Sequence, residues 1–279
     1  MPLIIGQINL PPYIRAMQMM TLANFYSRVL KRNYYLDIYI PDSGLDQAYF
    51  FLFNDGQILD DIRLLPVLQS WEERGIPVFA VGIHASDHRL QDYGVSGIPD
   101  YKQRGAQAGE YKHLIVAELL PYLKQVFRIM PEPDRSAIIG FSLGGLSALD
   151  IGWSHPEIFT QVGVFSGSFW WRSKAFSPTH PDAHRIMHER LSRSFYKPGM
   201  RFWFQTGTDD ESSDRNNNGV IDSIDDTQDV IRVLESLGYE NGKDIAYLEI
   251  AGGRHEPGTW ADAFPQLIQW IINKTSYAK

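Results

Sequence analysis

The chain has 279 residues, enough for one large domain or two small ones. It contains no cysteine, which excludes disulfides, thiolate metal sites and cysteine nucleophiles. The 26 lysine and arginine residues are outnumbered by 33 aspartate and glutamate residues, so the formal net charge is -7, and the lack of a basic run argues against a nucleic-acid partner. No segment approaches the roughly 18 consecutive apolar residues of a spanning helix, so no membrane partner is expected.

The start of the chain, Met1-Pro2-Leu3-Ile4-Ile5-Gly6, lacks the basic region that precedes the apolar stretch of a secretory signal peptide. We therefore expect a cytoplasmic protein. No composition break, repeat or low-complexity tract divides the sequence, which favours a single domain over residues 1–279, with one Asp- and Asn-rich loop at about 209–226.

Short, nearly continuous apolar runs predict β-strands in chain order at residues 33–40, 48–53, 77–83, 135–141, 159–165, 201–206 and 244–250. Apolar residues at helical spacing predict helices at 110–127, with a kink near Pro121, and at 143–153, 227–237 and 260–272. This alternation predicts an α/β fold, a mostly parallel sheet with helices on both faces. Chemistry in such sheets lies in the loops that follow the carboxyl ends of the strands.

One such loop carries a nucleophile motif. Gly140-Phe141-Ser142-Leu143-Gly144-Gly145 stands between a predicted strand and an apolar helix, which is the setting of the Gly-x-Ser-x-Gly elbow of α/β-hydrolases. The sharp turn exposes the Ser142 hydroxyl, and glycines leave room for it. The amide of Leu143, at the start of the helix, is then placed to bind an oxyanion.

A serine nucleophile needs a positioned imidazole and a carboxylate behind it. His255 follows the last predicted strand and completes the chain order serine, acid, histidine. The acid is expected after the strand at 201–206, where Asp209, Asp210 and Glu211 are adjacent; we favour Asp210, then Glu211, then Asp209. His84 and His88 follow an earlier strand and are interpreted as walls of the cleft.

Residues 214–225 fit the twelve-residue calcium loop of EF-hands. Oxygen side chains fall at its first, third, fifth, ninth and twelfth positions, and Gly219 at its sixth. We therefore predict a structural calcium ion, with the ligands Asp214, Asn216, Asn218, Val220 (through its carbonyl), Asp222 and Asp225. Aspartate replaces the usual glutamate at the twelfth position, which favours weaker binding or a shift towards magnesium. No cofactor is expected for catalysis.

Three stretches give the chain a resemblance to the putative-esterase family, which includes enterochelin esterases, feruloyl esterases and the mycolyltransferase antigen 85 proteins. They are residues 140–149 around the elbow, Ser166-Gly167-Ser168-Phe169-Trp170-Trp171, and Gly252-Gly253-Arg254-His255 with Trp260 five residues later. The similarity runs from about Tyr34 to the carboxyl terminus. Arg254, between the glycine pair and the histidine, departs from the family pattern, and so does the calcium-like loop.

The resemblance implies an α/β-hydrolase fold and further site residues. Asn54-Asp55-Gly56-Gln57 is similar to the loop that supplies the second oxyanion amide, here Gln57. Arg89 and Trp170 correspond to the substrate cleft. Gly207-Thr208-Asp209-Asp210 resembles the feruloyl esterases, which favours Asp210 as the acid, whereas antigen 85 proteins favour the next position, Glu211.

Together these features predict a serine hydrolase that cleaves a small-molecule carboxylic ester through an acyl-enzyme. Two alternatives stay open from the sequence. The first is acyl transfer to an alcohol on the same triad. The second is a non-catalytic, calcium-stabilised binding module that keeps the fold without turnover.

Overall fold

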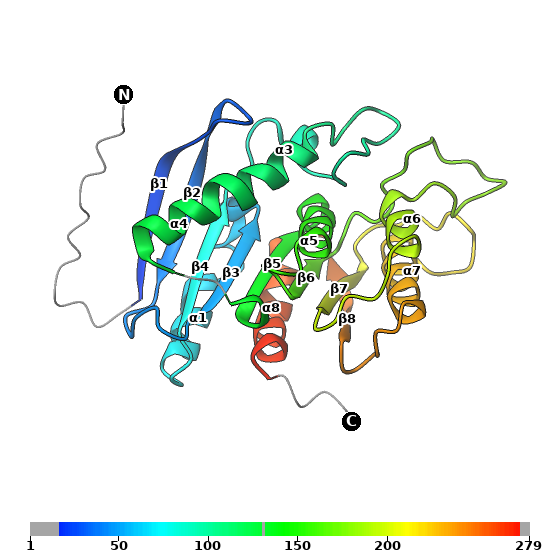
Figure 1. Ribbon diagram of the computed structural model, residues 1–279. Coiled ribbons are helices and arrows are strands. Elements are labelled where there is room, and N and C mark those ends of the chain that lie inside the picture. The colour runs from blue at the N-terminus through cyan, green and yellow to red at the C-terminus, as the bar shows by residue number, and fades with distance from the viewer. Residues whose placement is uncertain (1–16, 130–131, 274–279) are drawn as a thin grey trace.

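The computed structural model describes residues 17–129 and 132–273 (Figure 1). The segment on which the signal-peptide prediction rests, residues 1–6, lies outside this described part. Within it, no helix is both long enough and apolar enough to cross a bilayer.

An eight-stranded sheet organises the described chain. Its strands, in spatial order, are β1 (Gln18–Ser27), β2 (Arg32–Ile40), β4 (Val78–Ile83), β3 (Tyr49–Asn54), β5 (Ser136–Phe141), β6 (Gln161–Phe165), β7 (Arg201–Asp209) and β8 (Ile245–Arg254). The strand β2 runs antiparallel to both β1 and β4, and every other neighbouring pair is parallel. The predicted mostly parallel α/β sheet is confirmed.

Helices cover both faces of this sheet (Figure 1). In chain order they are η1 (Gly56–Ile58), α1 (Leu64–Glu72), α2 (Arg89–Asp92), α3 (Ala108–His113), η2 (Leu114–Leu119), α4 (Leu120–Phe127), η3 (Pro133–Arg135), α5 (Leu143–Ser154), α6 (Ile186–Ser192), α7 (Asp222–Ser236) and α8 (Pro257–Ile272). Apolar residues of α1 and α8 pack on one face of the sheet. Those of α3 to α7 pack on the other. The two buried clusters explain why the central strands are apolar on both sides.

The predicted elements are present, with shifted ends. The seven predicted strands correspond to β2 to β8, and the predicted helices to the α3–η2–α4 segment, α5, α7 and α8. The irregularity expected near Pro121 is a π-helical turn, η2, that ends two residues before the proline. Proline lacks the N–H that would continue the helical ladder, and a π turn is one way to absorb the lost bond. The strand β1 and the helices α1 and α6 were not predicted.

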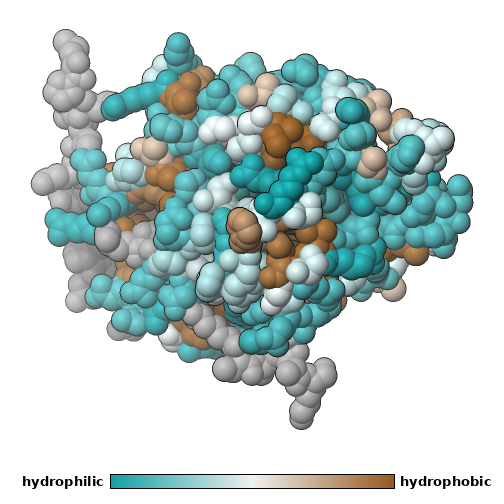
Figure 2. Space-filling model, turned by 45° about the vertical axis from the view of Figure 1, so that its right-hand side comes forward, coloured by the Kyte–Doolittle hydropathy of each residue, from teal (hydrophilic) through white to brown (hydrophobic). Residues whose placement is uncertain are grey.

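The surface outside these clusters is mixed. On the face drawn in Figure 2, apolar side chains occur in separate patches between hydrophilic ones. The large apolar side chains with the most exposure include Phe195, at 85%, and Tyr26 and Tyr35, both above half. Scattered exposed apolar residues are usual on soluble domains and do not by themselves mark an interface.

Candidate active site

Ser142 occupies the sharp turn between β5 and α5. Its backbone has φ 55° and ψ -123°, a left-handed region that residues with a Cβ rarely adopt. The Ser142 amide donates to the Phe165 carbonyl at 2.8 Å, which joins the turn to the carboxyl end of the neighbouring strand β6. The strained conformation and its place at the carboxyl edge of the sheet are those predicted for a nucleophile elbow.

Two glycines make this turn sterically possible. A Cβ added to Gly140 would lie 2.1 Å from the Gly144 carbonyl oxygen, and one added to Gly144 would lie 2.4 Å from Asp55 Oδ2. Both distances are far below a normal contact. The elbow therefore requires glycine at both positions. Backbone atoms of Gly144 occupy the space of a side chain at position 140, and the buried Asp55 carboxylate occupies that space at position 144.

His255 lies between the end of β8 and the start of α8. Its ring packs edge-on against Trp260, with centroids 5.5 Å apart and an interplanar angle of 80°. The residue as a whole is exposed to solvent. Its ring is nevertheless partly buried, and this burial lowers the pKa of His255. The negative charge of Asp210 acts to raise the pKa, and the positive charge of Arg89 acts to lower it further. His255 is thus within electrostatic reach of both side chains.

The three adjacent acids have different surroundings. Both carboxylate oxygens of Asp210 are buried, whereas Asp209 and Glu211 are exposed residues. Burial raises the pKa of Asp210, and the Gly207 amide, the Ser166 hydroxyl and His255 each act to lower it. None of these groups forms a hydrogen bond of normal geometry with the carboxylate in the described part of the chain. Although Glu211 is exposed as a residue, partial burial of its carboxyl group also raises its pKa, and His255 is not among the groups that influence it.

The edge of the sheet that bears Ser142 also holds a partly buried ion pair that the sequence did not indicate. Asp55, the first residue after β3, is left-handed (φ 61°) and buried. Its carboxylate receives two hydrogen bonds from Arg89, at 2.7 and 2.8 Å. Arg89 remains about one-third exposed, with a side-chain exposure of 30%. The Asp55 carboxylate therefore fixes the Arg89 side chain, and the substrate-cleft role that the resemblance implies for Arg89 stays a prediction.

The two predicted oxyanion amides belong to the starts of α5 and η1. Leu143 is the first residue of α5, where an amide has no intrahelical acceptor. Gln57 lies inside η1, and its side-chain oxygen accepts from the Ala85 amide at 2.9 Å while its side-chain nitrogen donates to Asp55 at 3.2 Å. These contacts hold η1 against the segment that follows β4.

Aromatic and histidine residues border the same edge. Trp170 is partly exposed, and the Arg104 guanidinium lies 5.4 Å from its ring and 4.6 Å from that of Trp171. His84, interpreted from the sequence as a cleft wall, is paired with Asp37 at 2.6 Å. His88 precedes α2, next to Arg89. The side chains after β4 and β6 thus present rings and guanidinium groups on one edge.

The predicted calcium loop is a compact turn whose last residues are helical. Asp222 and Asp225 lie in the first turn of α7, which begins five residues earlier than predicted. Asp225 accepts from the side-chain amides of Asn216 and Asn218 at 3.0 and 2.8 Å. Asp214 accepts from the Asn218 and Gly219 amides. Within the described residues, no three histidine, aspartate or glutamate side chains form a group that could hold a metal.

One predicted ligand of this loop has another partner. Asp222 accepts from the side chain of Arg215 at 3.0 Å and from the Arg215 amide at 2.9 Å. Arg215 is itself nearly buried, with a side-chain exposure of 4%, and it also pairs with Asp182 and Asp226 at 2.9 and 3.1 Å. The Arg215 guanidinium therefore already neutralises part of the acidic charge of the loop, which the sequence pattern predicted a metal ion would do.

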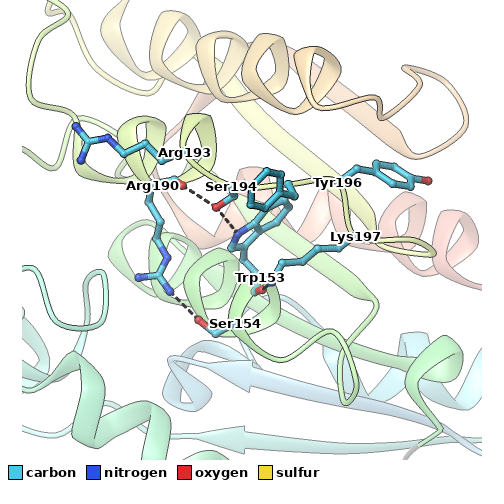
Figure 3. Close-up of a pocket in the computed structure, with 8 residues that line it drawn as sticks. Trp153, Ser154, Arg190, Arg193, Ser194, Tyr196 and Lys197 are labelled. Carbon is cyan, nitrogen blue, oxygen red and sulfur yellow. Dashed lines mark hydrogen bonds between the residues drawn. The ribbon is translucent and has the colours of Figure 1, made fainter.

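A shallow hollow of about 520 Å³ lies away from the elbow (Figure 3). It adjoins the opposite end of α5, where Trp153 and Ser154 lie, and it includes Arg190, Arg193 and Lys197. Each of these cations has a partner: Asp150 for Arg190, Glu189 for Arg193 and the Trp153 carbonyl for Lys197. Because these cations already have partners and the hollow is remote from Ser142, we do not assign it to the active site.

Comparison with known proteins agrees with the site geometry. The mostly parallel sheet and the strained turn at Ser142 are those of the α/β-hydrolase fold. A model of the family described as Putative esterase matches residues 27–271. The chain belongs to this family.

Individual relatives are more distant or match only in part. An uncharacterised protein of Bacillus subtilis, YbbA, is 22% identical over 246 residues, which are 85% of this chain and 89% of that protein. The iron(III) enterobactin esterase of Escherichia coli K12 is 46% identical over 130 residues, 43% of this chain and 32% of that enzyme. The enterobactin esterase structure from Shigella flexneri superposes with a TM-score of 0.69 at 22% identity, over 90% of this chain and 59% of that one. The chain thus spans about three-fifths of that structure's length.

Proposed function

We propose that the protein hydrolyses carboxylic esters through an acyl-enzyme on Ser142, with His255 as general base and Asp210 as the acid that orients it. The observation that carries the proposal is the left-handed backbone of Ser142 between β5 and the first turn of α5. This conformation costs on the order of 1–3 kcal/mol and persists where it serves a function. Here it presents a hydroxyl beside the first amides of a helix.

The proposed role of each residue follows from the charge that it carries or stabilises during the reaction. His255 takes the Ser142 proton as Oγ attacks the ester carbonyl, and then gives it to the leaving alcohol. The amides of Leu143 and Gln57 stabilise the oxyanion. Asp210 stabilises the imidazolium that forms, and its electrostatic influence on His255 supports this role over Glu211. No hydrogen bond joins His255 to Ser142 in the described chain, and such bonds are often long before substrate binds.

The substrate is proposed to carry an aromatic or anionic acyl part. Arg89 supplies a partly exposed positive charge, and Trp170 a partly exposed ring, on the edge that bears Ser142. The structure of the Shigella flexneri enterobactin esterase was determined in the presence of 2,3-dihydroxy-N-benzoyl-glycine, which carries a catechol ring, so catecholate esters belong to the panel to be tested.

The test is a panel of chromogenic esters of graded acyl length, with aromatic and catecholate acyl groups included, assayed on wild type and Ser142→Ala. A fluorophosphonate should label Ser142 alone, and Ser142→Ala should lose several orders of magnitude in kcat. An alcohol added to the assay separates hydrolysis from acyl transfer, because a transferase would form the new ester. Full activity in Ser142→Ala would rule out the proposed mechanism.

We further propose that the loop at 214–225 binds one calcium ion, with Asp214, Asn216, Asn218, the Val220 carbonyl and Asp225 as ligands. The convergence of Asn216 and Asn218 on Asp225 supports this, since rotation of either amide by half a turn would offer an oxygen instead of a nitrogen. Asp222 would have to leave Arg215 to join them. Calorimetric titration of metal-stripped protein with calcium, beside Asp214→Ala, is the test; a wild type that binds no calcium and keeps its melting temperature in chelator would refute it.

A further inference from the structure

A second serine lies against the nucleophile. Ser168, in the loop that follows β6, has its Oγ 3.4 Å from the Ser142 Oγ. Its amide donates to the Ser142 carbonyl at 3.1 Å. Ser168 is 5% exposed, so its hydroxyl is withdrawn from bulk water. Within the described residues, Ser142 is the hydrogen-bond partner of this hydroxyl.

The loop holds Ser168 in this place. The Phe169 amide donates to the Gly167 carbonyl at 2.7 Å, and the Phe169 ring is fully buried. A Cβ on Gly167 would lie 2.7 Å from both Phe169 and Val164, so the turn is tightly packed. Two backbone contacts and a buried ring therefore fix the Ser168 side chain, which lowers the entropy lost when its hydroxyl bonds to another group.

We infer that Ser168 is a further catalytic residue, whose hydroxyl donates a hydrogen bond to the Ser142 Oγ. The inference rests on the proposed function, because it assigns Ser168 a role only when Ser142 is the nucleophile. The Ser142 proton goes to His255 while the bond from Ser142 Oγ to the ester carbon forms, and Ser168 keeps its own proton throughout. The alkoxide leaves as the alcohol after protonation by His255.

Charge explains why this bond would assist the reaction. Negative charge develops on Ser142 Oγ as its proton departs, and again when that oxygen leaves the acyl carbon in deacylation. A hydrogen bond to a charged oxygen is about twice as strong as one to a neutral oxygen. The Ser168 bond would therefore be stronger in both transition states than in the ground state, which is the condition for raising kcat.

The experiment compares Ser168→Ala with Ser168→Cys and Ser168→Thr. Loss of a hydrogen bond to a charged group predicts a roughly 10- to 100-fold fall in kcat/KM and in the second-order rate of fluorophosphonate labelling for Ser168→Ala. Because binding is unaffected, the Kd of a substrate-like competitive inhibitor should stay the same. Ser168→Thr, which keeps a hydroxyl, should recover most of the rate, and Ser168→Cys, with a weak donor, should lie between. Ser173→Ala, an exposed serine of the same loop, is the matched control and should behave as wild type.

The outcomes separate this inference from the proposed function. If wild type labels at Ser142 and Ser168→Ala labels at the same rate, or faster, the inference is wrong while the esterase mechanism stands. If wild type neither labels nor hydrolyses any ester, the proposed function itself fails. Melting temperatures of all variants are measured beside the rates, and Ser168→Cys decides the matter if Ser168→Ala does not fold, since a wild-type rate there would overturn the inference.

Discussion

Arg89 and Asp55 form a two-point ion pair in which Nε donates to Oδ1 at 2.7 Å and a terminal nitrogen to Oδ2 at 2.8 Å. The pair joins the loop after β3 to the short helix α2 that follows β4, and the Asp55 carboxylate at its centre also lies against the elbow glycine Gly144. The same carboxylate therefore holds the Arg89 side chain and packs against the turn that carries Ser142.

Removing the Arg89 charge should shift the pH profile upwards. The positive charge of Arg89 lowers the pKa of His255, so Arg89→Gln should raise that pKa, and the acid limb of kcat/KM should move to higher pH. Arg89→Lys keeps the charge and should leave the limb nearer its original place. Profiles from pH 5 to 9 provide the measurement. Superimposable limbs for wild type and Arg89→Gln would contradict the electrostatic contact.

In wild type, the acid limb itself should lie low. Burial lowers the pKa of His255 below the ordinary value of about 6.5, and the base must be neutral to accept a proton. Activity should therefore be retained on acidification until the pH falls through this lowered pKa, and then be lost. His255→Ala should abolish activity across the whole range. A limb centred well above 6.5 in wild type would show that another group controls the base.

The three adjacent acids should differ sharply in their effect. Asp210→Asn should keep the fold and lower kcat by about 10³- to 10⁴-fold, because the imidazolium loses its stabilising charge. Asp209→Asn and Glu211→Gln remove carboxylates of exposed residues and should cost little. Steady-state kinetics with one chromogenic ester compares all three variants. Greater damage from Glu211→Gln would move the acid by one residue, to the arrangement of the antigen 85 proteins.

The elbow glycines should be irreplaceable for two different reasons. Gly140→Ala would press a methyl group onto the Gly144 carbonyl, which cannot move without opening the turn, so we expect a large loss of stability. Gly144→Ala would instead displace the Asp55 carboxylate and so disturb Arg89, lowering activity more than stability. The control is Gly109→Ala in α3, where a Cβ meets nothing within 4 Å and should be neutral or stabilising by up to about 1 kcal/mol. Equal melting temperatures for Gly140→Ala and Gly109→Ala would refute the steric explanation.

Arg215 should be required for stability whether or not a metal binds. It is nearly buried among Asp182, Asp222 and Asp226, and its removal leaves Asp226, at 1% exposure, without part of its compensation. Breaking such a buried pair costs about 3–5 kcal/mol, so Arg215→Gln should unfold at markedly lower denaturant. The control, Arg193→Gln, breaks the pair between Arg193, whose side chain is 79% exposed, and Glu189, and it should change the denaturation midpoint little. Similar denaturation midpoints for the two variants would show that the ion pairs of Arg215 make no net contribution to the free energy of unfolding.

The sequence was sufficient where local pattern and packing agree. Strands β3 to β7 are buried on both faces, so their apolar runs stand out, and the elbow is defined within six consecutive residues. It was insufficient for β1, because a register shift between Leu22 and Phe25 interrupts the two-residue alternation of an edge strand. The helix α6 has only seven residues, too few for a clear helical period.

By itself, then, the sequence determined the class of fold, the serine elbow and the family, because each depends on residues close together in the chain or on repeated apolar spacing. Only the tertiary structure distinguished the surroundings of Asp210 from those of Glu211, since adjacent carboxylates are chemically alike and differ here in burial and in their electrostatic influence on His255. The pairs Arg89–Asp55 and Ser168–Ser142 likewise join residues 34 and 26 positions apart. Such contacts are decided by how the strands of one sheet bring their carboxyl ends together, which no local pattern in the chain records.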